Sequence, residues 1–150
     1  MSRFRRLSET MLASPQIAAD DVAAARSEGV TLIVNNRPEG EAADQTPGAE
    51  IEAAARAAGI GYLAIPIGHS GFSRPQIEAM AEALENAPGP VLGYCRSGTR
   101  STLLWALAQA SRGEDPEALA AAATEAGYDL APIRPAMDML AAEEGSGQSR

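Results

Sequence analysis

The chain has 150 residues, a formal net charge of -8 and a sequence pI of about 4.6. This length fits a single domain with one core, and the acidic balance argues against nucleic acid or an anionic membrane surface as the main partner. All of the basic residues are arginine, which excludes Schiff-base chemistry on a lysine of this chain. A single cysteine cannot form an intrachain disulfide, and no apolar signal-peptide core stands near the start, so we expect a cytoplasmic protein.

Strands and helices are predicted to alternate along the chain. Two short extended segments, 5–8 and 11–13, precede a helix over 19–28. Apolar runs then predict buried strands over 30–34, 62–67 and 90–94, with helices following them over 49–58, 74–86 and 101–111. Two further helices are predicted over 116–126 and 135–143. We expect one catalytic domain over 1–144, followed by a flexible tail over 145–150 whose Gly and Ser content is typical of a linker.

This alternation predicts an α/β fold with a largely parallel sheet. Three polar segments directly follow the three main strands: Asn35-Asn36-Arg37, Gly68-His69-Ser70 and Cys95 to Arg100. Because ligands of open parallel sheets bind outside the carboxyl ends of the strands, we expect these segments to converge on one site.

The strongest chemical signal is the segment Cys95-Arg96-Ser97-Gly98-Thr99-Arg100-Ser101. A cysteine between a strand and a helix N-terminus lies where free N–H groups and the helix dipole favour a thiolate. Backbone N–H groups of the loop can form an anion-binding nest, with Gly98 free to adopt a positive φ. Arg100 can offer a bidentate fork to an oxyanion above the sulfur, and Ser101 can donate a hydrogen bond to the thiolate. An inert core cysteine is the alternative, but it would need no such row of donors.

Three residues outside the loop are further candidates. Asn36 and Arg37 can add polar groups and positive potential for an anionic substrate, although Arg37 could equally pair with Glu39 or Glu41 and only pin its own loop. His69 is the only histidine and could act as a general acid, bind the oxyanion, or be a solvent-exposed loop residue. Arg96 is expected at the rim, where it guides substrates or is solvated.

The segment from Tyr94 to Ser101 resembles the active loop of rhodanese-type sulfurtransferases, and tyrosine and dual-specificity phosphatases have a similar loop with one more residue between Cys and Arg. Over 12–113 the chain resembles the phosphatase-like domain of bacterial beta-lactamase hydrolase-like proteins, on Ser14-Pro15-Gln16, Asn35-Asn36-Arg37-Pro38 and Cys95 to Ser101. The resemblance implies a dual-specificity or tyrosine-phosphatase-like fold, with a largely parallel sheet flanked by helices. That family is often labelled sulfur transferase, and in some bacteria it is fused to a domain related to persulfide dioxygenases.

The resemblance leaves the reaction open, and loop length favours sulfur transfer. A six-residue loop encloses a smaller space than a seven-residue one, which suits a persulfide sulfur better than a phosphoryl group. A phosphatase also needs a general acid for its leaving group, which raises the rate about 10²- to 10⁴-fold. Loop 68–72 has no Asp that could serve as this acid. Glu39 and Asp44, on loop 39–48, are expected to be surface charges, and the alternative is that they approach the mouth of the site. We therefore predict a sulfurtransferase in which Cys95 takes sulfur from thiosulfate or a low-molecular-weight persulfide and passes it to a thiol acceptor.

Two alternatives remain at this point. One is a phosphatase that forms a phosphocysteine on Cys95, and the other is an inactive anion- or protein-binding domain. No metal or organic cofactor is expected, because neither metal-ligand spacing nor a nucleotide-binding motif occurs in the sequence. We expect no nucleic-acid or membrane partner, and the resemblance implies a persulfide dioxygenase-like protein as a partner.

Overall fold

The computed structural model describes residues 3–148, and within them a sheet of five strands lies at the centre of the molecule in the order β1-β2-β5-β3-β4. The strands are β1 (Arg5–Ser8), β2 (Met11–Ser14), β3 (Leu32–Asn35), β4 (Gly61–Ala64) and β5 (Val91–Tyr94). β2, β5, β3 and β4 run parallel to one another, and only β1 is antiparallel to its neighbour. The predicted α/β fold with a largely parallel sheet is therefore confirmed.

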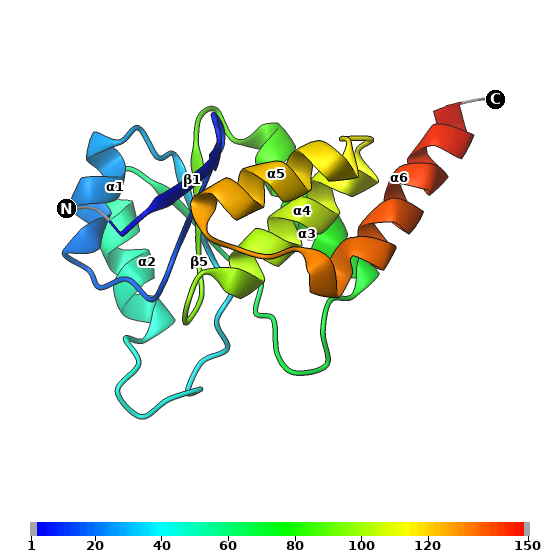
Figure 1. Cartoon of the computed structure of the whole chain (residues 1–150). Helices are drawn as coiled ribbons and strands as arrows, with labels where there is room; N and C mark the ends of the chain where they lie inside the picture. Colours follow the sequence, from blue (N-terminus) through cyan, green and yellow to red (C-terminus); the bar gives the residue numbers. More distant parts are fainter. Residues whose placement is uncertain (1–2, 149–150) are drawn as a thin grey trace.

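Helices cover both faces of this sheet (Figure 1). The face on the left carries α1 (Asp21–Ser27) and α2 (Gly48–Ala57), and the other carries α3 (Arg74–Asn86), α4 (Thr99–Ser111), α5 (Pro116–Ala126) and α6 (Arg134–Gln148), with a short 3-10 turn, η1 (Ala131–Ile133). Successive side chains of the central strands alternate between the two faces. Ile33 and Leu92 pack toward α1 and α2, whereas Val34 and Val91 join the core under α4. The sheet thus separates two apolar layers.

α4 is the buried helix of the larger layer, and its approach to β5 depends on Gly93. A Cβ at Gly93 would lie 2.9 Å from Cε of Met11 and 3.2 Å from Cβ of Ser101. Only glycine permits this close packing without a shift of its neighbours. The N-terminus of α4 is thereby held against the carboxyl end of β5, and the loop from Cys95 to Gly98 connects them. The helix predicted over 101–111 therefore begins two residues earlier, at Thr99, and includes Arg100.

The sequence predicted the bounds of two helices correctly. α3 and α5 have the bounds that the sequence predicted, and Ser73 caps α3 with a capping box completed by Gln76. Within residues 3–148, no helix combines the length and the apolar character needed to cross a membrane.

Two expectations were wrong. The sequence predicted a buried strand over 62–67, but β4 ends at Ala64 and is mostly exposed because it is the last strand of the sheet. The apolar residues that follow it, Ile65 and Ile67, are the buried ones. α6 also runs to Gln148, past the end of the helix predicted over 135–143, and the flexible tail expected over 145–150 stays a prediction. The rest of that expected tail, 149–150, lies outside the described residues.

Candidate active site

Cys95 directly follows β5 and is fully buried, with 0 % of its surface exposed. Its Sγ accepts a hydrogen bond from the backbone N–H of Gly98 at 3.1 Å. Gly98 has φ of 95° and is the N-cap residue of α4, so the chain turns back on the sulfur before the helix begins. The sulfur therefore lies at a helix N-terminus, where the dipole and the free N–H groups favour negative charge.

Backbone hydrogen bonds fix the loop on both sides. The N–H of Cys95 donates to the carbonyl of Ser14 at 3.3 Å, and the N–H of Gln16 donates to the carbonyl of Arg96 at 3.3 Å. At the helix end, the hydroxyl of Thr102 donates to the carbonyl of Gly98 at 2.9 Å. The end of β2 and the first turn of α4 thus hold the loop between them.

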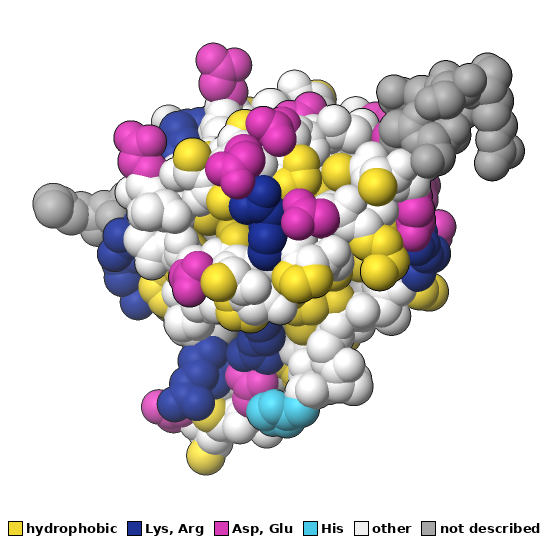
Figure 2. All heavy atoms as spheres, turned by 45° about the vertical axis from the view of Figure 1, so that its right-hand side comes forward, with side chains coloured by type: hydrophobic (Ala, Val, Ile, Leu, Met, Phe, Trp, Pro, Cys, Tyr) yellow, Lys and Arg dark blue, Asp and Glu magenta, His cyan; other side chains and the backbone are white. Residues whose placement is uncertain are grey.

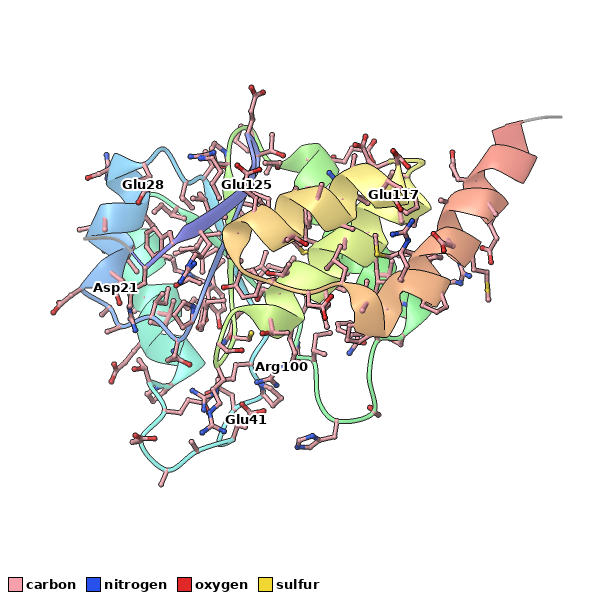
Figure 3. The ribbon with its side chains drawn as sticks, in the orientation of Figure 1. Asp21, Glu28, Glu41, Arg100, Glu117 and Glu125 are labelled. Carbon is pink, nitrogen blue, oxygen red and sulfur yellow. The ribbon has the colours of Figure 1, made fainter. Side chains whose placement is uncertain are left out.

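The guanidinium of Arg100 is held by a carboxylate from another loop. Nη1 and Nη2 of Arg100 donate to Oε2 and Oε1 of Glu41, each at 2.8 Å, and Nη1 also donates to the carbonyl of Ile67 at 2.8 Å. Figure 3 shows the Glu41 and Arg100 side chains next to each other at the same edge of the domain. This pairing was not predicted.

Arg37 holds the same carboxylate. Its Nε donates to Oε1 of Glu41 at 2.9 Å, and its Nη1 donates to Oε1 of Gln16 at 3.0 Å. Of the two alternatives for Arg37, pairing with a loop carboxylate is therefore what the structure shows, although two arginines sharing one carboxylate still leave a net positive charge beside Cys95.

The shared carboxylate has altered electrostatics. The pKa of Glu41 is lowered from 4.5 to about 2, chiefly by the hydrogen bond from Arg100 and further by Arg37, with burial opposing the shift. The pKa of Arg100 is raised mainly by the hydrogen bond to Glu41 and also by the charge of the nearby Cys95. Both partners stay ionised across the physiological range.

Asn36 and Ser101 form a buried pair beneath the loop. The Ser101 hydroxyl donates to Oδ1 of Asn36 at 2.7 Å, and Nδ2 of Asn36 donates to the carbonyl of Ile65 at 2.9 Å. The structure therefore corrects the prediction that the Ser101 hydroxyl bonds to the thiolate, because the hydroxyl donates its one hydrogen bond to Oδ1 of Asn36. Asn36 is fully buried and bonds to Ser101 and Ile65, and its predicted role in anion binding stays a prediction.

The other predicted residues lie at the rim or on the surface. Arg96, Ser97 and Thr99 are exposed, and the hydroxyls of Ser97 and Thr99 bond to each other at 3.0 Å. His69 is exposed on the loop before α3, and Figure 2 shows the histidine on the surface near arginine and acidic side chains. Glu39 is tied to the start of α2, since its carboxylate accepts the N–H of Gly48 at 3.1 Å.

Three residues near the loop were not predicted as part of the site. Glu41 was considered only as a partner of Arg37, and Gln16 only as part of a family motif. Tyr128, after α5, donates its hydroxyl to the carbonyl of Ser97 at 3.3 Å, and burial raises the pKa of this phenol. No local signal marks Glu41 as a partner of Arg100, because 59 residues separate the two.

Comparisons with known proteins identify the family of the chain. The family model described as beta-lactamase hydrolase-like protein, phosphatase-like domain, matches residues 3–112. A beta-lactamase hydrolase-like protein of Xylella fastidiosa (strain 9a5c) is 35 % identical over 133 residues, which cover 85 % of this chain and 30 % of that protein. The chain spans between 25 % and 30 % of the length of the curated relatives that it matches.

Solved structures share the fold. A candidate phosphatase from Neisseria meningitidis has a TM-score of 0.81 at 29 % identity, covering 93 % of this chain and 99 % of that one. The catalytic core of the PP-IP phosphatase SIW14 from S. cerevisiae has a TM-score of 0.68 at 12 % identity, covering 92 % of this chain and 85 % of that one. The fold is thus phosphatase-like, and the chain belongs to the family of beta-lactamase hydrolase-like proteins through their phosphatase-like domain.

Proposed function

We propose that this domain hydrolyses phosphoric monoesters through a phosphocysteine on Cys95. The observation that carries the proposal is the Sγ of Cys95 at the N-terminus of α4, 3.1 Å from the backbone N of Gly98, with Arg100 in the first turn of the same helix. The phosphatase-like family and fold support phosphate chemistry more directly than sulfur transfer, which reverses the order that loop length alone suggested.

The two chemical steps use the groups of the loop. The Cys95 thiolate attacks phosphorus, and the electron pair of the ester P–O bond leaves with the alcohol oxygen, which takes a proton from a general acid or from water. Water then attacks the phosphocysteine, releasing inorganic phosphate and restoring the thiolate. Loop N–H groups and the Arg100 guanidinium are placed to stabilise the charge on the transferring phosphoryl oxygens.

The leaving group decides how much acid catalysis the reaction needs. His69 is the general acid that the sequence suggests, and its exposed position on a loop leaves this role a prediction. An aryl phosphate leaves as a stabilised phenolate and needs little proton transfer. We therefore expect aryl phosphates to be hydrolysed faster than alkyl phosphates.

Sulfur transfer is the second candidate, and the short loop favours it. The run from Cys95 to Arg100 has one residue fewer than the loops of tyrosine phosphatases, and full burial of Cys95 suits a single sulfur atom better than a phosphoryl group. In this reaction the thiolate attacks the outer sulfur of a sulfane donor, the donor's S–S bond breaks, and the Cys95 persulfide then gives its outer sulfur to an acceptor thiol.

One experiment separates the two reactions. Wild type and Cys95→Ser are each incubated with an aryl phosphate and, separately, with thiosulfate or glutathione persulfide, and turnover and intact mass are recorded. Because Cys95 is the only cysteine, any thiol adduct can be assigned to it. The proposal is supported if wild type hydrolyses the ester and forms a phosphoryl adduct while Cys95→Ser does neither. Persulfide formation without ester hydrolysis would overturn it in favour of sulfur transfer.

A further inference from the structure

Glu41 binds one particular edge of the Arg100 guanidinium. Its two carboxylate oxygens accept from Nη1 and Nη2, each at 2.8 Å. A guanidinium has five N–H donors in a fixed plane, so the donors that remain can be identified by subtraction. Glu41 takes two of them, and the carbonyl of Ile67 takes the second N–H of Nη1 at 2.8 Å.

The remaining donors of Arg100 are Nε–H and the second N–H of Nη2. These two lie parallel on the side edge of the guanidinium, and such a fork matches two oxygens of a tetrahedral oxyanion. Arg100 lies in the first turn of α4, two residues after Gly98, whose N–H bonds to the sulfur, and the charge of Cys95 contributes to the raised pKa of Arg100. Glu41 therefore binds the edge of the guanidinium formed by Nη1 and Nη2. The side edge formed by Nε and Nη2 is left for a ligand.

Glu41 is itself anchored from the opposite side. Arg37, only 5 % exposed, donates to Oε1 of Glu41 at 2.9 Å and to Oε1 of Gln16 at 3.0 Å. Gln16 in turn donates its backbone N–H to the carbonyl of Arg96. The series Gln16, Arg37, Glu41 and Arg100 is thus bonded at one end to the Arg96 carbonyl of the cysteine loop and ends in the first turn of α4. It orients the guanidinium relative to the loop.

We propose that Glu41 is a positioning residue that fixes Arg100 with its side edge toward the phosphoryl group on Cys95. This inference rests on the proposed function, because it assumes that Arg100 binds the oxygens of a phosphoryl group. The opposing account makes Glu41 an internal anion that a substrate must displace from Arg100. The two accounts differ in sign, since removal of a positioning residue weakens oxyanion binding and removal of a competitor strengthens it.

The test compares Glu41→Gln with Asp44→Asn in the same protein. Both variants remove one negative charge from the loop between β3 and α2, but Asp44 is exposed and serves as the matched charge control. For Glu41→Gln we expect kcat to fall about tenfold and tungstate, measured by calorimetry, to bind more weakly, because small misplacements of a catalytic group are costly. Asp44→Asn should behave like wild type. Tighter tungstate binding by Glu41→Gln, or behaviour equal to that of Asp44→Asn, would overturn the positioning role.

Glu41→Asp separates geometry from charge. It keeps the carboxylate but shortens its reach, so a positioning role predicts losses in kcat and tungstate affinity, whereas a pure charge effect predicts wild-type values. Thermal unfolding of each variant identifies any that fails to fold. If the wild type neither hydrolyses aryl phosphates nor binds tungstate, the proposed function itself fails. If the wild type does both and the Glu41 variants match it, only the present inference fails.

Discussion

The two halves of the site are held by different kinds of interaction. The Cys95 half is built from buried backbone between β2, β5 and α4, and Cys95 has no exposed surface. The Arg100 half is built from side chains that remain partly exposed, at 23 % for Arg100 and 19 % for Glu41. Charge-assisted bonds rather than core packing set its geometry.

This difference separates stability from activity. A change in the Cys95 half disturbs packed backbone, so it should lower the free energy of unfolding and activity together. A change in the Arg100 half alters an ion pair near solvent, where such pairs contribute little to stability, yet it moves the group that meets the substrate. Substitutions in the Cys95 half are therefore expected to lower stability and activity together, and substitutions in the Arg100 half are expected to lower activity alone.

The largest effect is expected for Gly98→Ala. Gly98 has φ of 95°, which costs an L-residue roughly 1–2 kcal/mol, and an added Cβ would overlap the Tyr128 hydroxyl. Displacement of the N–H that bonds to Sγ should reduce kcat/KM by about 10²-fold. Steady-state kinetics and thermal unfolding measure the two effects.

Gly59→Ala is the control for this prediction. Gly59 also has a positive φ, at 76°, and nothing lies within 4 Å of its would-be Cβ. It should carry a similar backbone penalty while keeping wild-type kcat/KM. If both variants lose stability but keep wild-type kcat/KM, the geometry of the Cys95 loop does not control activity.

The next largest effect is expected for Asn36→Ala. This substitution leaves the Ser101 hydroxyl and the Ile65 carbonyl without their bonds to the Asn36 amide, and an unsatisfied buried group costs about 1–3 kcal/mol. Denaturant unfolding measures the loss, and a double-mutant cycle with Ser101→Ala isolates the coupling of the pair. Additive losses would show that the 2.7 Å bond contributes nothing of its own.

The sequence predicted the parts of the site that are contiguous. Cys95, Gly98 and Arg100 lie in one contiguous segment that runs into the first turn of α4, and the Cys-to-Arg spacing, the glycine and the helix are all local signals. The convergence of Asn36 and Arg37 on this loop also followed from the sheet, because the carboxyl ends of neighbouring parallel strands meet.

The missed features depend on contacts between distant segments. Glu41 lies 59 residues from Arg100, and nothing in its own loop distinguishes it from Glu39. The Ser101 hydroxyl was assigned to the thiolate because Asn36 comes from a neighbouring strand whose register the sequence does not reveal. β4 was predicted as buried because an apolar run does not show the strand order, and in the structure β4 lies at the edge of the sheet.

A smaller effect is expected from the Glu41 ion pairs, and its pH dependence is confined to acid pH. Association with Arg100 and Arg37 lowers the pKa of Glu41 from 4.5 to about 2. A carboxylate with a lowered pKa stabilises the fold above its unfolded-state pKa, and this contribution is lost as the pH falls through the folded-state pKa. The difference in unfolding free energy between wild type and Glu41→Gln should therefore be constant at neutral pH and shrink from about 4.5 toward 2. Chemical denaturation across this range measures it, and a pH-independent difference would contradict the assignment of the charge-assisted bonds.

The smallest effect is expected for Tyr128→Phe. This substitution tests whether the exposed part of the Cys95 loop depends on a side-chain hydrogen bond as much as the buried part depends on its backbone. The phenol donates to the carbonyl of Ser97 at 3.3 Å, a long bond to an exposed residue that water can replace. Its loss should cost no more than about 1 kcal/mol, and kcat/KM should fall by only a small factor. The bond from the Cys95 N–H to the Ser14 carbonyl and the bond from the Thr102 hydroxyl to the Gly98 carbonyl still fix the loop. Tyr128→Ala, which also removes the ring, is the comparison that separates hydrogen bonding from packing. A loss of activity in Tyr128→Phe as large as that in Gly98→Ala would mean that this phenol, which lies outside the part matched by the family model, holds the loop in place of the buried backbone.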